Sequence, residues 1–239
     1  MTKATIRYTC LALLALLFLP CNPSGASAGE LQGALKEILG QIDASPDLRI
    51  AGEQVFMSPE LVRFYREREY QPLWSTVDRK GREQIRTALH YFASTPGSGL
   101  CGADYHLPFF REVLSHFTIK ENFYGLPRLR WSGWYDILLT DALFHYALHM
   151  IEGRVPADAI QEGWNLRKKK VELSRVINFA FENDELDKVL RDFQPDDKHY
   201  RALQQALERY REIEALGGWA PLPEGEPVRP GMEDLRLPS

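Results

Sequence analysis

The stretch "LTDALFHYALHMIEGRV" runs from Leu139 to Val155 and decides how the rest of the chain is interpreted. Its apolar residues recur at spacings of three and four, which predicts a long amphipathic helix over about residues 134–151. Gly153 and Pro156 follow the periodic segment and predict where this helix ends. We expect a central helix whose buried face comprises Leu138, Leu139, Ala142, Leu143, Tyr146, Ala147 and Met150.

The same stretch carries Asp141, His145 and His149 at intervals of four, so that all three would lie on one helix face within reach of a single metal ion. A zincin helix has a glutamate directly after its first histidine, but here that position is Tyr146. The alternative is that the three polar side chains line the flank of the helix and hydrogen-bond to neighbouring segments. We favour this structural interpretation and predict neither a metal site nor a cofactor.

Helical periodicity continues over most of the chain, and no segment alternates with a period of two over more than a few residues. "SPE" (Ser58 to Glu60) predicts a helix start, with Ser58 as the N-cap and Pro59 at the first helical position. Pro72 ends that helix by disfavouring helical geometry at the preceding residue. The predicted fold is an all-α, bundle-like domain, with further helices at about 30–42, 79–93, 109–117, 171–181, 185–193 and 197–216.

Two segments are predicted to lack long helices. Residues 94–107 contain a proline and three glycines and should form a loop. Residues 220–239 contain five prolines and should form a flexible tail. In the helix between Asp197 and Leu216, we expect a core-facing row formed by Tyr200, Leu203, Leu207, Tyr210 and Ile213.

The N-terminus has the features of a secretory signal peptide. Lys3 and Arg7 precede the apolar run at residues 10–19, and "ASA" at 26–28 predicts cleavage after Ala28. The apolar run is shorter than the roughly 20 residues that span a bilayer, so we predict an exported, periplasmic protein without a transmembrane anchor. Lipid attachment at Cys21 is the alternative, which Pro20 disfavours.

Cleavage would leave Cys101 as the one cysteine of the mature chain and exclude an internal disulfide. Loss of Lys3 and Arg7 moves the formal net charge from −4 to −6, which offers no general attraction for nucleic acid. A thiol nucleophile at Cys101 with His106 as its base is a second catalytic hypothesis, but five residues of separation in a glycine-rich loop is weak support.

Five segments in a fixed order resemble one family: "FYREREYQPLW" (64–74), "GSGLCGADYHL" (97–107), "LLTDALFHYALHMIEGRV" (138–155), the isolated Trp164, and "QPDDKHYRALQQALERYR" (194–211). Together they resemble the helical scaffold domain of the large L,D-transpeptidases of the YcbB type, which cross-link peptidoglycan in the bacterial periplasm. The resemblance covers about Gln54 to Trp219. "VRPGMEDLRLPS" (228–239) further resembles the opening of the small peptidoglycan-binding module of those enzymes.

The domain organisation that follows is a signal peptide at 1–28, an N-terminal helix and linker at 29–53, the scaffold domain at 54–219, and a tail at 220–239. The helix within 29–53 precedes the resemblance. It is either a tether from the membrane side or a first helix docked on the bundle.

The resemblance implies a non-catalytic scaffold portion of a transpeptidase, truncated before the catalytic domain. The enzymes act through a cysteine in a Ser-His-Gly-Cys segment, which this sequence lacks. The implied partner is peptidoglycan or a periplasmic cell-wall protein such as a catalytic transpeptidase domain. The alternatives are a stand-alone peptidoglycan-binding or adaptor module, for which Trp134 and Trp164 are the candidate contacts, and a metal- or thiol-dependent hydrolase. For the aromatic residues in general, we favour core packing over sugar stacking.

Overall fold

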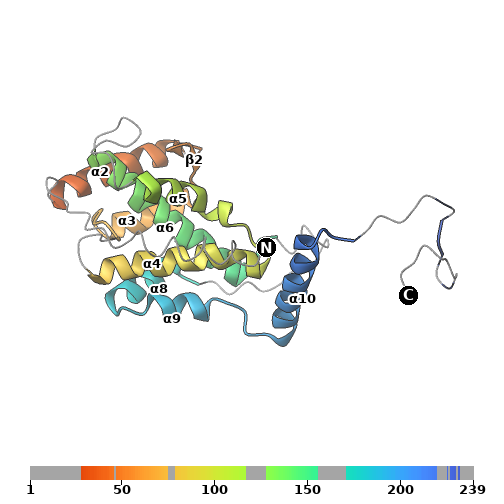
Figure 1. Ribbon diagram of the computed structural model, residues 1–239. Coiled ribbons are helices and arrows are strands. Elements are labelled where there is room, and N and C mark those ends of the chain that lie inside the picture. Colours follow the sequence, from red (N-terminus) through yellow and green to blue (C-terminus); the bar gives the residue numbers. More distant parts are fainter. Residues whose placement is uncertain are drawn as a thin grey trace. The chain divides into compact units, whose positions relative to one another are not determined.

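The computed structural model describes residues 28–45, 47–74, 79–116, 128–155 and 171–219, with a few positions of the tail (Figure 1). The only strands within these residues are β1 (Arg49–Ile50) and β2 (Glu53–Gln54), which form an antiparallel pair. The prediction of an all-α fold is confirmed. The helices are α2 (Ala28–Ala44), α3 (Ser58–Glu67), α4 (Arg79–Ser94), α5 (Leu107–His116), α6 (Arg128–Glu152), α8 (Leu173–Glu182), α9 (Leu186–Asp192) and α10 (Lys198–Ala215), with short 3-10 helices η2 (Thr95–Ser98) and η3 (Gly102–Tyr105).

The chain divides into two compact units. The first extends to Asp196 and contains every described helix up to α9, whereas the second begins at Asp197 and contains α10. The hydrophobic core lies in the first unit, because every buried apolar residue of the described segments precedes Asp196.

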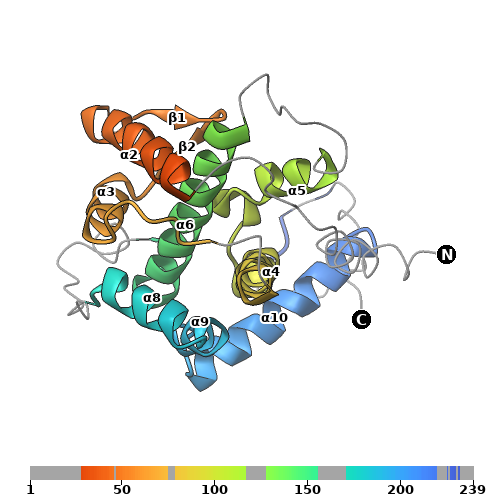
Figure 2. The same cartoon turned by 90° about the vertical axis from the view of Figure 1, so that its left-hand side faces the viewer.

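Helix α6 is the centre of the first unit. Figure 2 shows it passing through the middle of the helices around it, and α2, α3, α4 and η3 all pack against it. Every residue from Tyr135 to Phe144 is buried, so the middle of this 25-residue helix is enclosed on all sides. The sequence predicted one buried face, and the structure buries the polar flank as well.

Helix α2 is docked on the bundle, which decides between the two alternatives for this segment. Its apolar residues Leu35, Ile38, Leu39 and Ile42 are buried in the main core. Helix α2 packs tightly against Gly133 of α6, where an added Cβ would lie 2.8 Å from Cδ1 of Ile38. The absence of a side chain at Gly133 therefore lets the two helices approach each other.

Helix α3 begins at Ser58, and its N-cap is Met57 rather than the predicted Ser58. The Met57 side chain makes no capping hydrogen bond. Instead, the backbone N–H of Met57 donates to the carboxylate of Asp141 at 2.8 Å, so a side chain from another helix holds this helix start. A capping partner 84 residues away leaves no signal in the local sequence.

The turns around α3 and η3 are confirmed as breaks in the helical pattern. Helix α3 ends at Glu67, before Pro72, and Glu69 and Tyr70 adopt positive φ angles of 54° and 61°. The predicted loop at 94–107 contains η2 and η3 and ends at His106, which also has a positive φ of 53°. Gly153, with φ 84°, ends α6 as predicted.

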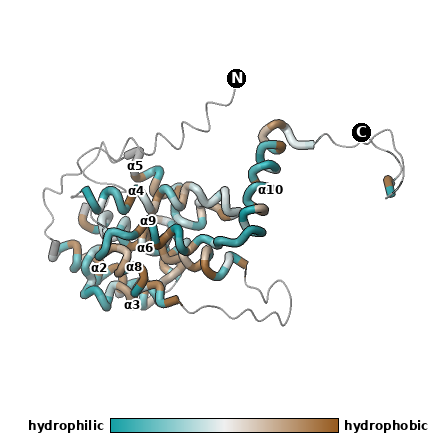
Figure 3. The backbone as a smooth tube through the Cα atoms, turned by 90° about the horizontal axis from the view of Figure 1, so that it is seen from below, coloured by the Kyte–Doolittle hydropathy of each residue, from teal (hydrophilic) through white to brown (hydrophobic). Residues whose placement is uncertain are grey.

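The predicted core-facing row on α10 is wrong. No residue of α10 is buried, and Leu203 and Tyr210 are 68% and 58% exposed. Most of the helix is hydrophilic, as the teal tube in Figure 3 shows. Apolar spacing predicts which residues share a helix face, but it does not supply a partner for that face. Helix α10 does begin as expected, since Asp197 accepts hydrogen bonds from the backbone N–H groups of His199 and Tyr200.

Several predicted features lie outside the described residues. They are the signal peptide up to residue 27, the lipidation alternative at Cys21, Trp164 and most of the proline-rich tail. In the part of the chain that is described, no helix combines the length and the apolar character that crossing a membrane requires.

The close approach of α2 and α6 makes a prediction for Gly133. Gly133→Leu should lower the free energy of unfolding by about 1–3 kcal/mol, because the new side chain would overlap Ile38 in a packed contact. The matched control is Gly40→Leu, which lies on the exposed side of α2 with no atom near its Cβ position. Gly40→Leu should raise the free energy of unfolding by roughly 0.5–1 kcal/mol, because leucine has a higher helix propensity than glycine. Urea unfolding measures both, and equal effects of the two substitutions would contradict the docked arrangement.

Candidate functional site

Helix α6 carries a column of polar side chains through the core. Asp136, Thr140 and Asp141 are buried in its middle, and the half-buried His145 and His149 continue the column towards its C-terminal end. A buried polar group costs free energy unless it is hydrogen-bonded. We call these five residues the α6 polar column.

Asp136 holds the turn that follows α3. Its carboxylate accepts hydrogen bonds from the backbone N–H groups of Leu73 at 3.1 Å and Trp74 at 3.0 Å. The Tyr65 hydroxyl also donates to this carboxylate and lies 2.7 Å from the Thr140 hydroxyl. Burial nevertheless raises the pKa of Asp136 to about 6, since these hydrogen bonds offset only part of the desolvation.

Thr140 completes this contact from the next turn of α6. Its hydroxyl accepts a hydrogen bond from the indole N–H of Trp74 at 3.0 Å and donates to the backbone carbonyl of Asp136 at 2.8 Å. The hydroxyl of Tyr65 and the indole N–H of Trp74 therefore both have hydrogen-bond partners within the core. Core packing, not an exposed sugar-stacking surface, is the observed role of these two residues.

Asp141 joins two further segments. Its carboxylate accepts from the backbone N–H groups of Phe56, at 3.1 Å, and Met57. It also lies 2.8 Å from Nε2 of His106, and both side chains are completely buried. The prediction that Asp141 hydrogen-bonds to neighbouring segments is confirmed, and the residue is completely buried.

His106 bridges two carboxylates. Its Nδ1 lies 2.9 Å from Oε2 of Glu53, opposite the contact of Nε2 with Asp141. An imidazole can donate to both carboxylates only when it is protonated. Burial lowers the pKa of His106, but the hydrogen bonds to Asp141 and Glu53 outweigh it and raise the pKa above the usual value of 6.5. The sequence did not reveal this bridge, because Glu53 and Asp141 are 53 and 35 residues away from His106.

His145 and His149 contact η3. Nδ1 of His145 lies 3.0 Å from the backbone carbonyl of Asp104, and Nδ1 of His149 lies 2.8 Å from the Tyr105 hydroxyl. Burial lowers the pKa of both imidazoles, in His149 to about 4 with a further contribution from His145. Both rings are therefore neutral at pH 7.

The predicted alternative of a metal site at Asp141, His145 and His149 is not formed as a triad. Asp141 is directed to Phe56, Met57 and His106, whereas the two histidines are directed to η3. Across the described segments, no group of three or more His, Cys, Asp or Glu side chains is arranged to hold a metal ion.

The hypothesis of a Cys101 thiol with His106 as its base also lacks a geometric basis. Cys101 is exposed, and His106 is completely buried with both ring nitrogens facing carboxylates. His106 therefore has no nitrogen available to accept a proton from the thiol. Of the other candidate contacts, Trp134 is half-buried against the core with the Arg130 guanidinium over its ring, and Trp164 is outside the described residues.

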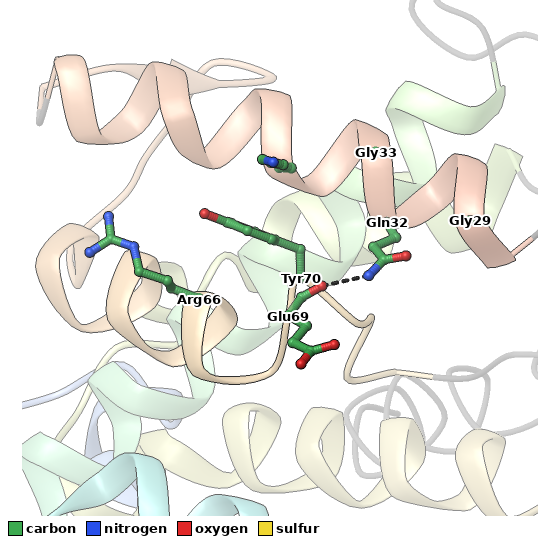
Figure 4. Close-up of a pocket in the computed structure, with 7 residues that line it drawn as sticks. Gly29, Gln32, Gly33, Arg66, Glu69 and Tyr70 are labelled. Carbon is green, nitrogen blue, oxygen red and sulfur yellow. Dashed lines mark hydrogen bonds between the residues drawn. The ribbon is translucent and has the colours of Figure 1, made fainter.

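A shallow hollow lies between α2 and the end of α3, with a volume of about 430 Å³ (Figure 4). The side-chain amide of Gln32 crosses it and donates to the carbonyl of Glu69 at 2.6 Å. Charges of both signs line it, and the Lys36 ammonium lies 5.7 Å from the centre of the Tyr70 ring. The hollow offers polar contacts to a ligand, but it contains no nucleophile with an adjacent base.

Comparison with known families assigns the chain to one family. The model of the family described as Scaffold domain matches residues 59–207, more than half of the chain. The chain belongs to the Scaffold domain family. The matched range contains all of α6 and most of the segments that its polar column holds, so the scaffold domain includes most of the core of the first unit, whereas the core residues of α2 precede the match. No curated protein and no solved structure gives a match.

The His106 bridge predicts a pH-dependent contribution to the stability of the scaffold domain. The pKa of His106 is higher in the folded protein than in the unfolded chain. Its contribution is therefore complete below about pH 6.5 and is lost as the pH rises through the raised value. Glu53→Gln removes one of the two carboxylates. We expect it to lower the free energy of unfolding by about 1 kcal/mol near pH 5.5, and by less near pH 8.5.

Urea unfolding of the wild type and of Glu53→Gln at both pH values measures this difference. His149 and Asp136 also have shifted pKa values and make stability depend on pH. Their contributions are the same in both proteins and cancel when the two proteins are compared. The matched control is Glu67→Gln, an exposed position on α3, which should show no such pH dependence. If Glu53→Gln lowers the free energy of unfolding equally at both pH values, the result would contradict a protonated His106 bridge.

Proposed function

We propose that this protein is the non-catalytic scaffold portion of a periplasmic L,D-transpeptidase of the YcbB type and takes part in peptidoglycan remodelling. Membership of the Scaffold domain family is the observation that carries the proposal. The more specific assignment to these transpeptidases rests on the sequence resemblance of the segments at 64–74, 97–107, 138–155 and 194–211.

The contacts of the α6 polar column support this proposal. Asp136 and Thr140 hold the segment 64–74, whereas Asp141, His145 and His149 hold residues of 97–107. Three segments that carry the resemblance are thus connected to one another in the core. These residues have structural partners, as expected for a supporting domain whose catalytic groups are supplied elsewhere.

The proposed lack of catalytic activity has two supports. The printed sequence contains no Ser-His-Gly-Cys segment, and Cys101 has no accessible base in His106. The catalytic residues would be supplied by a transpeptidase catalytic domain. The proposed periplasmic location rests on the signal peptide inferred at residues 1–28.

We propose α10 as the surface that binds a partner. Leu203 and Tyr210 lie seven residues apart on the same side of this helix, and both side chains are more than half exposed. Beyond the helix, Leu216 and Trp219 are 88% and 67% exposed. Exposed apolar groups of this kind are suited to burial against another domain. In the proposed function, that domain is the transpeptidase catalytic domain.

The second candidate function is a stand-alone peptidoglycan-binding or adaptor module. The hollow in Figure 4 favours it, because charges of both signs and an aromatic ring could contact the sugar and peptide groups of the cell wall. This second function requires that the chain bind peptidoglycan in the absence of a catalytic domain.

The test uses purified residues 29–239, a separately produced catalytic domain of a YcbB-type L,D-transpeptidase, and purified peptidoglycan sacculi. We expect the chain to bind the catalytic domain and to form no cross-links by itself. Leu203→Asp should weaken that binding at least about tenfold, because it places a charge in an apolar contact. Gln205→Asp, an exposed position of the same helix, is the matched control and should have little effect.

Retention on sacculi without binding to the catalytic domain would support the adaptor function instead. Cross-link formation by the chain alone would contradict the proposed lack of catalytic activity. Failure to bind either the catalytic domain or sacculi would contradict both candidate functions.

A further inference from the structure

His145 and His149 form a pair of imidazoles one helical turn apart. Their ring centroids are 4.1 Å apart, and both residues are half-buried at the end of the α6 polar column. Two histidines at positions i and i+4 of a helix can both bind one metal ion, because their side chains project from the same face. The helix fixes this spacing, whereas the unfolded chain does not.

The neighbouring residues fix the tautomer of His145 and allow the same tautomer in His149. The carbonyl of Asp104 can only accept a hydrogen bond, so Nδ1 of His145 must donate to it, and Nε2 then carries the free lone pair. The Tyr105 hydroxyl can accept from Nδ1 of His149 in the same manner. A histidine that binds metal through one nitrogen usually donates from the other to such an oxygen.

The two Nε2 atoms are available to a ligand. Among the described residues, neither makes a hydrogen bond, and neither is one of the buried polar atoms that lack a partner. The nearby Arg154 guanidinium is paired with the carboxylate of Asp104 at 3.1 Å, which limits its repulsion of a cation.

We propose that Nε2 of His145 and Nε2 of His149 together bind a divalent cation of the late first transition series, such as Zn²⁺, Ni²⁺ or Cu²⁺. Water completes the coordination of the ion, since Asp141 is occupied by Phe56, Met57 and His106. Imidazole ligands favour these metals over Mg²⁺ and Ca²⁺, which prefer oxygen. The site is independent of the transpeptidase proposal, because it depends only on α6 and η3.

The experiment titrates NiCl₂ and ZnCl₂ into residues 29–239 carrying Cys101→Ser, so that the exposed thiol does not bind metal. We expect one bound ion per chain and a rise in the thermal unfolding midpoint with metal concentration, since binding favours the folded state. MgCl₂ at the same concentrations should have no effect. His145→Gln and His149→Gln should each weaken Ni²⁺ binding at least about tenfold. His90→Gln, an exposed histidine on α4, is the matched control and should bind as before.

A second measurement remains decisive if the glutamine variants fold poorly. In the Cys101→Ser chain, paramagnetic Ni²⁺ should broaden the ring NMR signals of His145 and His149 before those of His90 and His199. Unchanged binding in both glutamine variants would overturn the proposal. Broadening that starts at other histidines, or no binding up to about 1 mM Ni²⁺, would also overturn it.

Discussion

The buried carboxylate of Asp141 is the interaction on which the arrangement of the scaffold domain depends. A charge without solvent exposure is tolerated only when hydrogen bonds and an opposite charge replace water. Asp141 obtains these from the backbone of residues 56–57 and from His106. One side chain on α6 therefore fixes the start of α3 and the end of η3, and removing either partner would leave a buried charge partly unsatisfied.

The carboxylate of Asp136, five residues earlier on α6, is likewise buried and held by hydrogen bonds. Its contacts with Tyr65, Leu73 and Trp74 fix the chain after α3, where two consecutive non-glycine residues adopt positive φ angles. Such backbone geometry is costly and persists only when the surrounding contacts determine it. The core is therefore specified by directional polar contacts as well as by apolar packing. A domain held in this way is suited to supporting another domain, which agrees with the function proposed for it.

The sequence predicted the features that depend on local patterns. The apolar spacing between Leu139 and Met150 predicted α6, and Pro72 and Gly153 predicted where α3 and α6 end. Features that depend on distant residues were missed or wrong. Ser58 is a suitable N-cap, but Asp141 from another helix holds that helix start. The apolar row on α10 shows helical spacing without burial, because spacing alone does not supply a partner. The pairing of His106 with Glu53 and Asp141 depends on the folded chain, and no local motif marks it.

Native-state hydrogen exchange of individual backbone amides tests the central role of the buried carboxylates most directly. The amides of Met57, Leu73 and Trp74 lie at or beyond the ends of α3, yet each donates to a carboxylate of α6. We predict that in the wild type they exchange as slowly as the buried amide of Leu143, through global unfolding. In Asp136→Ala, which removes both acceptor oxygens, Leu73 and Trp74 should lose this protection, whereas Met57 should keep it. Exchange of all three amides about a hundredfold faster than Leu143 in the wild type would contradict the account.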